Sequence, residues 1–128
     1  MSKNAESLFK DKICSHLKVF GVVTKYVPMQ GYSTQGTPDI HFHGRLFCGW
    51  LEFKGVKTRI TSLQKSIIHR FNLILPASAF VIRDGGEGSL HLIQNENGKT
   101  LATFKNGKNL LDQLYLLRQQ SLLGEVFF

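Results

Sequence analysis

Apolar residues recur at helical spacing in three segments of the chain, and the stretches between these segments alternate in polarity. The spacing predicts three helices, over residues 4–20, 60–75 and 109–122. Asn4 or Ser2 is expected to cap the first helix, and Thr61 or Ser62 the second, because short polar side chains accept hydrogen bonds from the first turn. Pro76 is expected to end the second helix, since proline cannot continue one.

Each predicted helix has an apolar face. The face of the first helix consists of Ala5, Leu8, Phe9, Ile13, Leu17 and Phe20. The face of the second consists of Ile60, Leu63, Ile67, Ile68, Phe71 and Leu75. The last helix is leucine-rich, with Leu110, Leu111, Leu114, Leu117 and Leu122. A face of this kind is more often internal core than a subunit interface, which stays the second choice.

Runs of β-branched and aromatic residues predict the strands of an α/β protein. The expected strands cover residues 22–28, 39–43, 46–54, 77–83, 89–94 and about 101–104. Gly44-Arg45 is a candidate two-residue hairpin between the second and third strands. The polar loop MQGYSTQGTP leads into the second strand. The sequence has no internal repeat or linker, so residues 1–128 are expected to form a single domain.

Two carboxylates stand out in the middle of the chain. Asp39 and Glu52 are the only acids between Lys12 and Asp84, among nine Lys or Arg residues. Strand alternation places Asp39 with His41 and His43 on one face, and Ile40 with Phe42 on the other. It places Glu52 and Lys54 on one face with Trp50, opposite Leu51 and Phe53. A hairpin between the strands would bring the two carboxylates and Lys54 together.

Gln64 lies within the apolar stripe of the second helix and therefore needs a partner. Burying an unpaired amide costs roughly 1–3 kcal/mol. The side chain is expected either to bond to the backbone or to meet the carboxylates. Two interpretations of Glu6 are open. It is either a first-turn acid that suits the helix dipole or a residue close to Asp39, Glu52 and Lys54.

The chain is basic, with 16 Lys and Arg residues against 9 Asp and Glu residues and a net charge of +7. This balance favours a polyanionic partner without specifying one. The two cysteines are far apart and form no CxxC pair, so free buried thiols are expected. No apolar run approaches the ~20 residues that span a bilayer. The N-terminal segment is amphipathic and charged, so it is not expected to be a signal peptide. A soluble cytoplasmic protein is the expectation.

The pieces Pro38-Asp39 and Glu52-Phe53-Lys54, in this order of elements, resemble the PD-(D/E)XK nuclease superfamily. Within it, Gly36-Thr37-Pro38-Asp39, Glu52-Phe53-Lys54-Gly55 and Gln64 are most similar to the VRR-NUC domain, over roughly residues 5–95. The resemblance implies a restriction-endonuclease-like fold, a mixed β-sheet flanked by helices with an αβββαβ core, here with a C-terminal helix added.

The resemblance also implies a metal-dependent DNA endonuclease that hydrolyses phosphodiester bonds. Asp39, Glu52 and the backbone carbonyl of Phe53 would bind Mg²⁺, for which Mn²⁺ can substitute; such hard oxygen ligands suit these ions. Lys54 would be catalytic, orienting the attacking water and stabilising the developing charge. By the same resemblance Gln64 supports the site, and Glu6 matches an acidic first-helix position that can serve a second metal.

Stand-alone VRR-NUC proteins of phages and bacteria resemble Holliday-junction resolvases and act as homodimers. The resemblance therefore implies branched DNA as the substrate and the cytoplasm of a bacterium or phage-infected host as the location. The candidate DNA contacts are Ser33, Gln35, Lys57, Arg59 and Lys65.

Three alternatives remain open from the residues. One is a sequence-specific restriction-type endonuclease, and another is a non-catalytic DNA-binding module that keeps the nuclease fold. The third concerns His41 and His43, which share a strand face and are able to ligate zinc. No cysteine cluster or HExxH helix completes such a site, so ordinary strand histidines are favoured.

Overall fold

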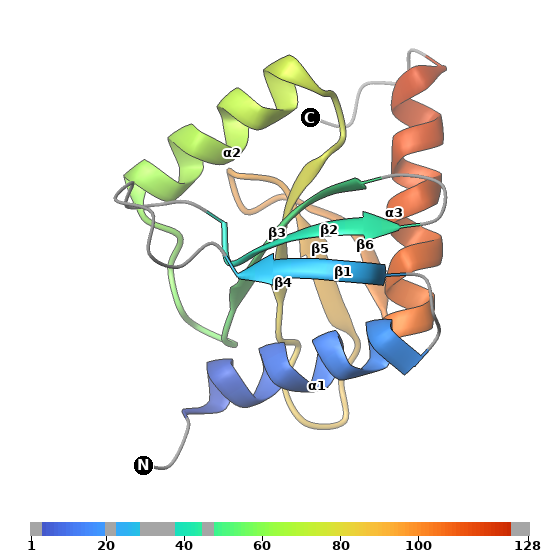
Figure 1. Cartoon of the computed structure of the whole chain (residues 1–128). Coiled ribbons are helices and arrows are strands. Elements are labelled where there is room, and N and C mark those ends of the chain that lie inside the picture. The colour runs from blue at the N-terminus through green and yellow to red at the C-terminus, as the bar shows by residue number, and fades with distance from the viewer. Residues whose placement is uncertain (1–3, 20–22, 29–37, 45–47, 124–128) are drawn as a thin grey trace.

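A computed structural model describes residues 4–19, 23–28, 38–44 and 48–123; the side chains of residues 18, 19, 23–28 and 44 lie outside this description. Three helices and six strands follow one another in these ranges (Figure 1). In chain order they are α1 (Ala5–Val19), β1 (Val23–Pro28), β2 (Ile40–Gly44), β3 (Cys48–Lys54), α2 (Ser62–Ile74), β4 (Ala79–Arg83), β5 (His91–Gln94), β6 (Thr100–Phe104) and α3 (Gly107–Leu122).

The described strands form one mixed sheet in the order β1-β2-β3-β4-β5-β6. The β3–β4 pair is parallel, and the other four pairs are antiparallel. A parallel pair needs a crossover connection, and α2 provides it. The chain therefore forms an α/β domain in which β3 and β4 occupy the middle of the sheet.

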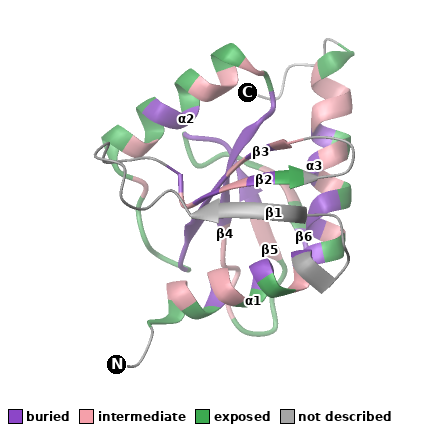
Figure 2. Ribbon diagram, viewed as in Figure 1, coloured by how far each residue is buried: buried purple, intermediate pink, exposed green. Residues whose placement is uncertain are grey.

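The two faces of the sheet are covered by different helices (Figure 1). One face packs against α1 and α3 and holds the main core. Its fully buried side chains include Ile13, Leu17, Phe42, Leu51, Phe53, Phe80, Ile82, Ile93, Phe104, Leu110 and Leu114. The other face packs against α2 around a smaller cluster of Ile68, Ala79 and Val81, with Trp50 and Phe71 beside it. Buried residues run along β3 and β4, as expected for strands covered on both faces (Figure 2).

The alternation of β2 and β3 confirms the predicted assignment of faces. Ile40, Phe42, Leu51 and Phe53 belong to the core under α1 and α3. Trp50 belongs to the opposite cluster under α2. In the register of β2 and β3, Ile40 pairs with Leu51 and His41 with Trp50, so each cross-strand pair shares a face.

The predicted order of elements is confirmed, and most bounds differ by one to three residues. Of the candidate turn Gly44-Arg45, Gly44 is the last residue of β2, and Arg45 lies outside the described residues. Asn4 caps α1 through a 2.8 Å bond from the Ser7 N–H, as predicted. No helix within the described ranges is long and apolar enough to cross a membrane.

Three leucines expected on buried helix faces are exposed. Leu8, Leu63 and Leu122 have exposed fractions of 57%, 45% and 68%. Each lies on the margin of its apolar stripe, where the neighbouring layer no longer covers the helix. The rest of the leucine face of α3 is core: Leu110, Leu111, Leu114 and Leu117 are buried.

Asn72 ties the end of α2 to the start of β4. Its side-chain oxygen accepts the backbone N–H groups of Ser78 and Ala79, each at 2.9 Å. Its side-chain nitrogen donates to the Ala79 carbonyl at 2.9 Å. One side chain therefore satisfies three backbone groups at the start of the central parallel strand.

We expect Asn72→Ala to lower the free energy of unfolding by about 2–4 kcal/mol, because three part-buried backbone groups lose their partner. Urea unfolding followed by circular dichroism measures this change. Leu73→Ala is the matched control, since the neighbouring side chain is 70% exposed; it should change stability by no more than about 0.5 kcal/mol. Equal stabilities of the two variants would contradict the role of Asn72.

Candidate active site

Asp39 lies at the point where the pairing of β2 with β3 ends. The last paired residues are Ile40 and Leu51. Beyond them, the Phe53 N–H donates to the Asp39 carboxylate at 2.8 Å. The side chain of Asp39 thus takes the place of a strand carbonyl and is fixed beside the end of β3. The buried Pro38 immediately precedes it.

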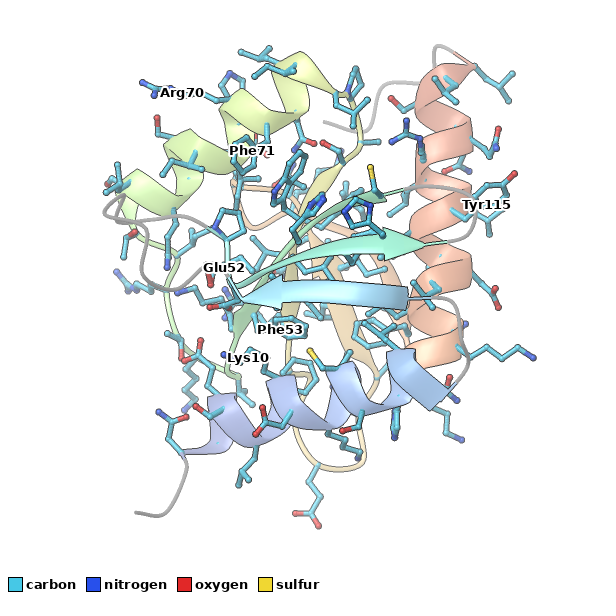
Figure 3. All side chains as sticks on the ribbon, in the orientation of Figure 1. Lys10, Glu52, Phe53, Arg70, Phe71 and Tyr115 are labelled. Atoms are coloured by element: carbon cyan, nitrogen blue, oxygen red, sulfur yellow. The ribbon has the colours of Figure 1, made fainter. Side chains whose placement is uncertain are left out.

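Glu52 and Lys54 lie on the face of β3 opposite Leu51 and Phe53, as the alternation predicts. Both are buried, with exposed fractions of 3% and 5%. Figure 3 shows Phe53 on the side of the strand towards α1, and Glu52 nearer to α2. A glutamate and a lysine buried in a central strand are unusual, because charged groups lose hydration there.

The Glu52 carboxyl is strongly perturbed by its surroundings. Burial raises its pKa from 4.5 to about 9, and the hydrogen bond and negative charge of Asp39 act in the same direction. The positive charge of Lys54 opposes this shift in pKa. At neutral pH, Glu52 therefore holds a proton against the Asp39 carboxylate.

The donor set at this point fits a hard divalent cation. The buried Glu52 and the half-buried Asp39 are hydrogen-bonded through a shared proton, which a cation would displace. The N–H and C=O of one strand residue point to the same side, so the Phe53 carbonyl is directed to the edge where Asp39 accepts the Phe53 N–H. Two carboxylate groups and a main-chain carbonyl are ligands typical of Mg²⁺, which keeps several waters.

Glu6 lies next to the site rather than within it. Its Cβ is close to Gly55, at 3.8 Å from the position that a Cβ on that glycine would take. Its negative charge also contributes to the raised pKa of Glu52. Within the described ranges, however, no three His, Cys, Asp or Glu side chains converge as a metal site. The side-chain part of the candidate centre is therefore the pair Asp39 and Glu52.

The Gln64 side chain bonds to the backbone, which is one of its two predicted partners, rather than to the carboxylates. It is the third residue of α2, and its Oε1 accepts the Thr61 N–H at 2.9 Å, while Thr61 Oγ1 accepts the Gln64 N–H at 3.1 Å. This reciprocal capping box starts the helix. The structure thus gives Gln64 a local role at the amino end of α2.

Arg83 is a positioning residue that the sequence did not reveal. It pairs with Lys54 in the β3–β4 register. Its guanidinium donates to the carbonyls of Gly55 and Thr58 at 2.9 and 2.7 Å and to Gln94 Oε1 at 2.8 Å. Arg83 thereby fixes the turn that follows Lys54. Its only sequence signal is a basic residue at the end of an apolar strand.

The predicted DNA contacts fall into two groups. Lys57, Arg59 and Lys65 are exposed, the first two in the turn after Lys54 and the third on α2. Ser33 and Gln35 lie outside the described residues. Figure 3 shows the exposed Arg70 pointing away from the sheet and Phe71 pointing towards it, so Arg70 adds a second exposed basic residue to Lys65 on α2.

The two strand histidines lie further along β2 on the same face as Asp39. Their Nε2 atoms are 2.9 Å apart. Burial lowers the pKa of His41, and the positive charge of His43 lowers it further. The His41 ring also stacks on Trp50, with ring centroids 4.9 Å apart. Cys48 and Cys14 form no disulfide; Cys14 is buried and Cys48 is half-buried.

Comparisons of the chain with known protein families, with curated proteins and with solved structures found no match. The residues of the candidate site are therefore what indicates a function.

The raised pKa of Glu52 predicts how stability depends on pH. Between about pH 5 and pH 9 the folded protein keeps a proton that the unfolded chain has lost, so stability falls as the pH rises. We expect Glu52→Gln, which is neutral and isosteric, to flatten this slope by up to about 1.4 kcal/mol per pH unit. Urea unfolding at several pH values, in EDTA, measures both slopes.

The control for this experiment is Glu87→Gln, which changes an exposed glutamate in the turn between β4 and β5. It should keep the slope of the parent protein. If Glu52→Gln and the parent protein lost stability equally between pH 5 and pH 9, Glu52 would not be the protonated group.

Proposed function

We propose that the chain is a metal-dependent phosphodiesterase with a fold of the restriction-endonuclease-like kind. The observation that carries the proposal is the meeting of Asp39 and Glu52 beside the buried Lys54, at the end of β3. The order α1-β1-β2-β3-α2-β4, with the carboxylates around β2 and β3, supports the same assignment.

More particularly, the proposed activity is that of a DNA endonuclease acting on branched DNA, in the manner of a Holliday-junction resolvase. The net charge of +7 supports a polyanionic substrate. The sequence resemblance to VRR-NUC domains supports DNA junctions and a homodimer. Exposed Leu116, Leu122 and Leu123 at the carboxyl end of α3 offer an apolar surface for such a dimer.

In this proposal each residue of the site has a separate task. Asp39, Glu52 and the Phe53 carbonyl would hold Mg²⁺, or Mn²⁺ in its place. Bound metal supplies electrophilic activation of the phosphate and of the attacking water. Asp39 is held in orientation by the Phe53 N–H, and Glu52 would release its proton to solvent on binding a cation. Lys54 provides a buried ammonium that stabilises the negative charge developing on the phosphate.

The proposal is tested by cleavage assays on four DNA substrates: linear duplex, single strand, flap and four-way junction, each with Mg²⁺ or with EDTA. We expect Mg²⁺-dependent cleavage of the junction, reduced by about 10²-fold or more in Asp39→Asn and in Lys54→Met. Lys99→Ala, an exposed lysine in the turn between β5 and β6, is the control and should keep full activity.

The outcomes separate the alternatives. Binding in EDTA without cleavage in Mg²⁺ would indicate a DNA-binding module. Cutting of plain duplex at one sequence would indicate a restriction-type enzyme. Undiminished cleavage by Asp39→Asn and Lys54→Met would contradict the site.

The exposed basic residues predict the salt dependence of DNA binding. In an Asp39→Asn background, replacing Lys57, Arg59 and Lys65 by Ala should weaken binding and lower the slope of log K against log salt by up to about 3. Fluorescence anisotropy in EDTA measures both. The charge-matched control replaces the exposed Lys99, Lys105 and Lys108, which lie around β6, by Ala. An equal loss in both triple variants would show that charge alone, not location, governs binding.

A further inference from the structure

His41 and His43 form a pair of imidazoles that the nuclease site does not use. They are two residues apart on β2 and therefore project from the same face of the sheet. Their Nε2 atoms are 2.9 Å apart, and their rings are nearly perpendicular, at 88°. Without an ion, one ring donates a proton to the other across this distance.

The same distance suits coordination of one metal ion. Imidazole nitrogens bind late first-row metals at about 2.0–2.1 Å. Two nitrogens 2.9 Å apart and at that distance from a common ion make an angle of about 90°. This angle is characteristic of square-planar or tetragonal Ni²⁺ and Cu²⁺ and is smaller than the tetrahedral angle that Zn²⁺ prefers.

Aromatic packing holds one of the two rings in place. His41 lies against Trp50 with ring centroids 4.9 Å apart, and Trp50 lies against Phe71 of α2 at 4.4 Å. This aromatic packing already restricts the His41 ring, so less side-chain entropy is lost when an ion binds. His43, by contrast, is exposed, so an ion from solvent can reach the pair.

We propose that His41 and His43 form a nitrogen-based site for a late first-row divalent ion, separate from the carboxylate site. Because no third His, Cys, Asp or Glu side chain joins them within the described ranges, water fills the other coordination positions. Imidazole selects Ni²⁺, Cu²⁺ and Zn²⁺ over Mg²⁺, which prefers oxygen. The proposal goes beyond the proposed nuclease function and does not depend on it.

Trp50 provides the measurement, because it is the only tryptophan of the chain. Ni²⁺ is the probe, since it does not oxidise the free thiols as Cu²⁺ would. Titrating the untagged full chain with Ni²⁺ should quench Trp50 fluorescence to saturation. Because Ni²⁺ also binds oxygen ligands, the bound ion is counted in Asp39→Asn, which weakens the carboxylate site; native mass spectrometry of this variant should show one Ni²⁺ per chain. His43→Asn, which changes the exposed partner, should raise the Ni²⁺ concentration for half-quenching by at least about tenfold, and His41→Asn should do the same.

Matched controls separate this site from the other metal ligands. His69→Asn changes an exposed histidine on α2 and should leave the titration unchanged. Cys48→Ser should also leave it unchanged, although Cys48 pairs with His43 in the register of β2 and β3. Excess Mg²⁺ and the Asp39→Asn variant should have no effect, and this independence distinguishes the histidine site from the nuclease centre.

Three results would overturn the proposal: saturation that survives both histidine replacements, saturation that is lost in Cys48→Ser, or competition by Mg²⁺. Circular dichroism of each variant shows whether it folds. Native mass spectrometry then reads the bound ion directly, so a changed Trp50 signal in His41→Asn does not obscure the result.

Discussion

The hydrogen bond from the Phe53 N–H to the Asp39 carboxylate is the contact on which the candidate site depends. The β2–β3 ladder stops at Ile40 and Leu51, and the next amide that faces β2 needs an acceptor. Asp39 supplies that acceptor with its side chain instead of its backbone. One consequence is that a carboxylate is fixed at the edge of the central strands. A second is that it lies against Glu52, which shares its face of the sheet.

This arrangement is electrostatically unfavourable when both acids are ionised. Glu52 loses hydration and faces a second carboxylate, and its pKa rises to about 9 for these reasons. Lys54 offsets part of the repulsion. A sequence selected for stability alone would place an apolar residue at position 52, between the buried Leu51 and Phe53. An acid with a raised pKa beside a second acid and a buried lysine is typical of functional sites, and the proposed function rests on this arrangement.

Much of this geometry could be predicted because strand alternation is a strict rule. The two-residue period placed Ile40, Phe42, Leu51 and Phe53 in the core and placed Glu52 and Lys54 on the other face. Helical stripes were less reliable, because spacing defines a face but not where the covering layer ends; Leu8, Leu63 and Leu122 are exposed for that reason.

The sequence pattern could not predict which of several possible partners a polar side chain would bind. The position of Gln64 within an apolar stripe indicated a need for a partner, but Thr61, three residues earlier, satisfies it locally. Arg83 reaches Gly55 and Thr58, 28 and 25 residues away along the chain. No local pattern encodes that distance, and the contact follows only from the parallel pairing of β3 with β4.

The face of the sheet towards α2 carries two pairs of polar side chains, Asp39 with Glu52 and His41 with His43. The two-residue period of the strands sets the distance between the two pairs. Asp39 and His41 are two residues apart along one strand face, so the oxygen pair and the nitrogen pair lie next to each other without sharing a ligand. The Trp50 ring, stacked on His41 and on Phe71, occupies the position opposite His41 in the neighbouring strand. Oxygen ligands at one end and imidazoles at the other differ in the metals they prefer. The two proposed sites thus lie side by side on one face of the β2–β3 pair, while apolar side chains pack on the opposite face of the sheet, under α1 and α3.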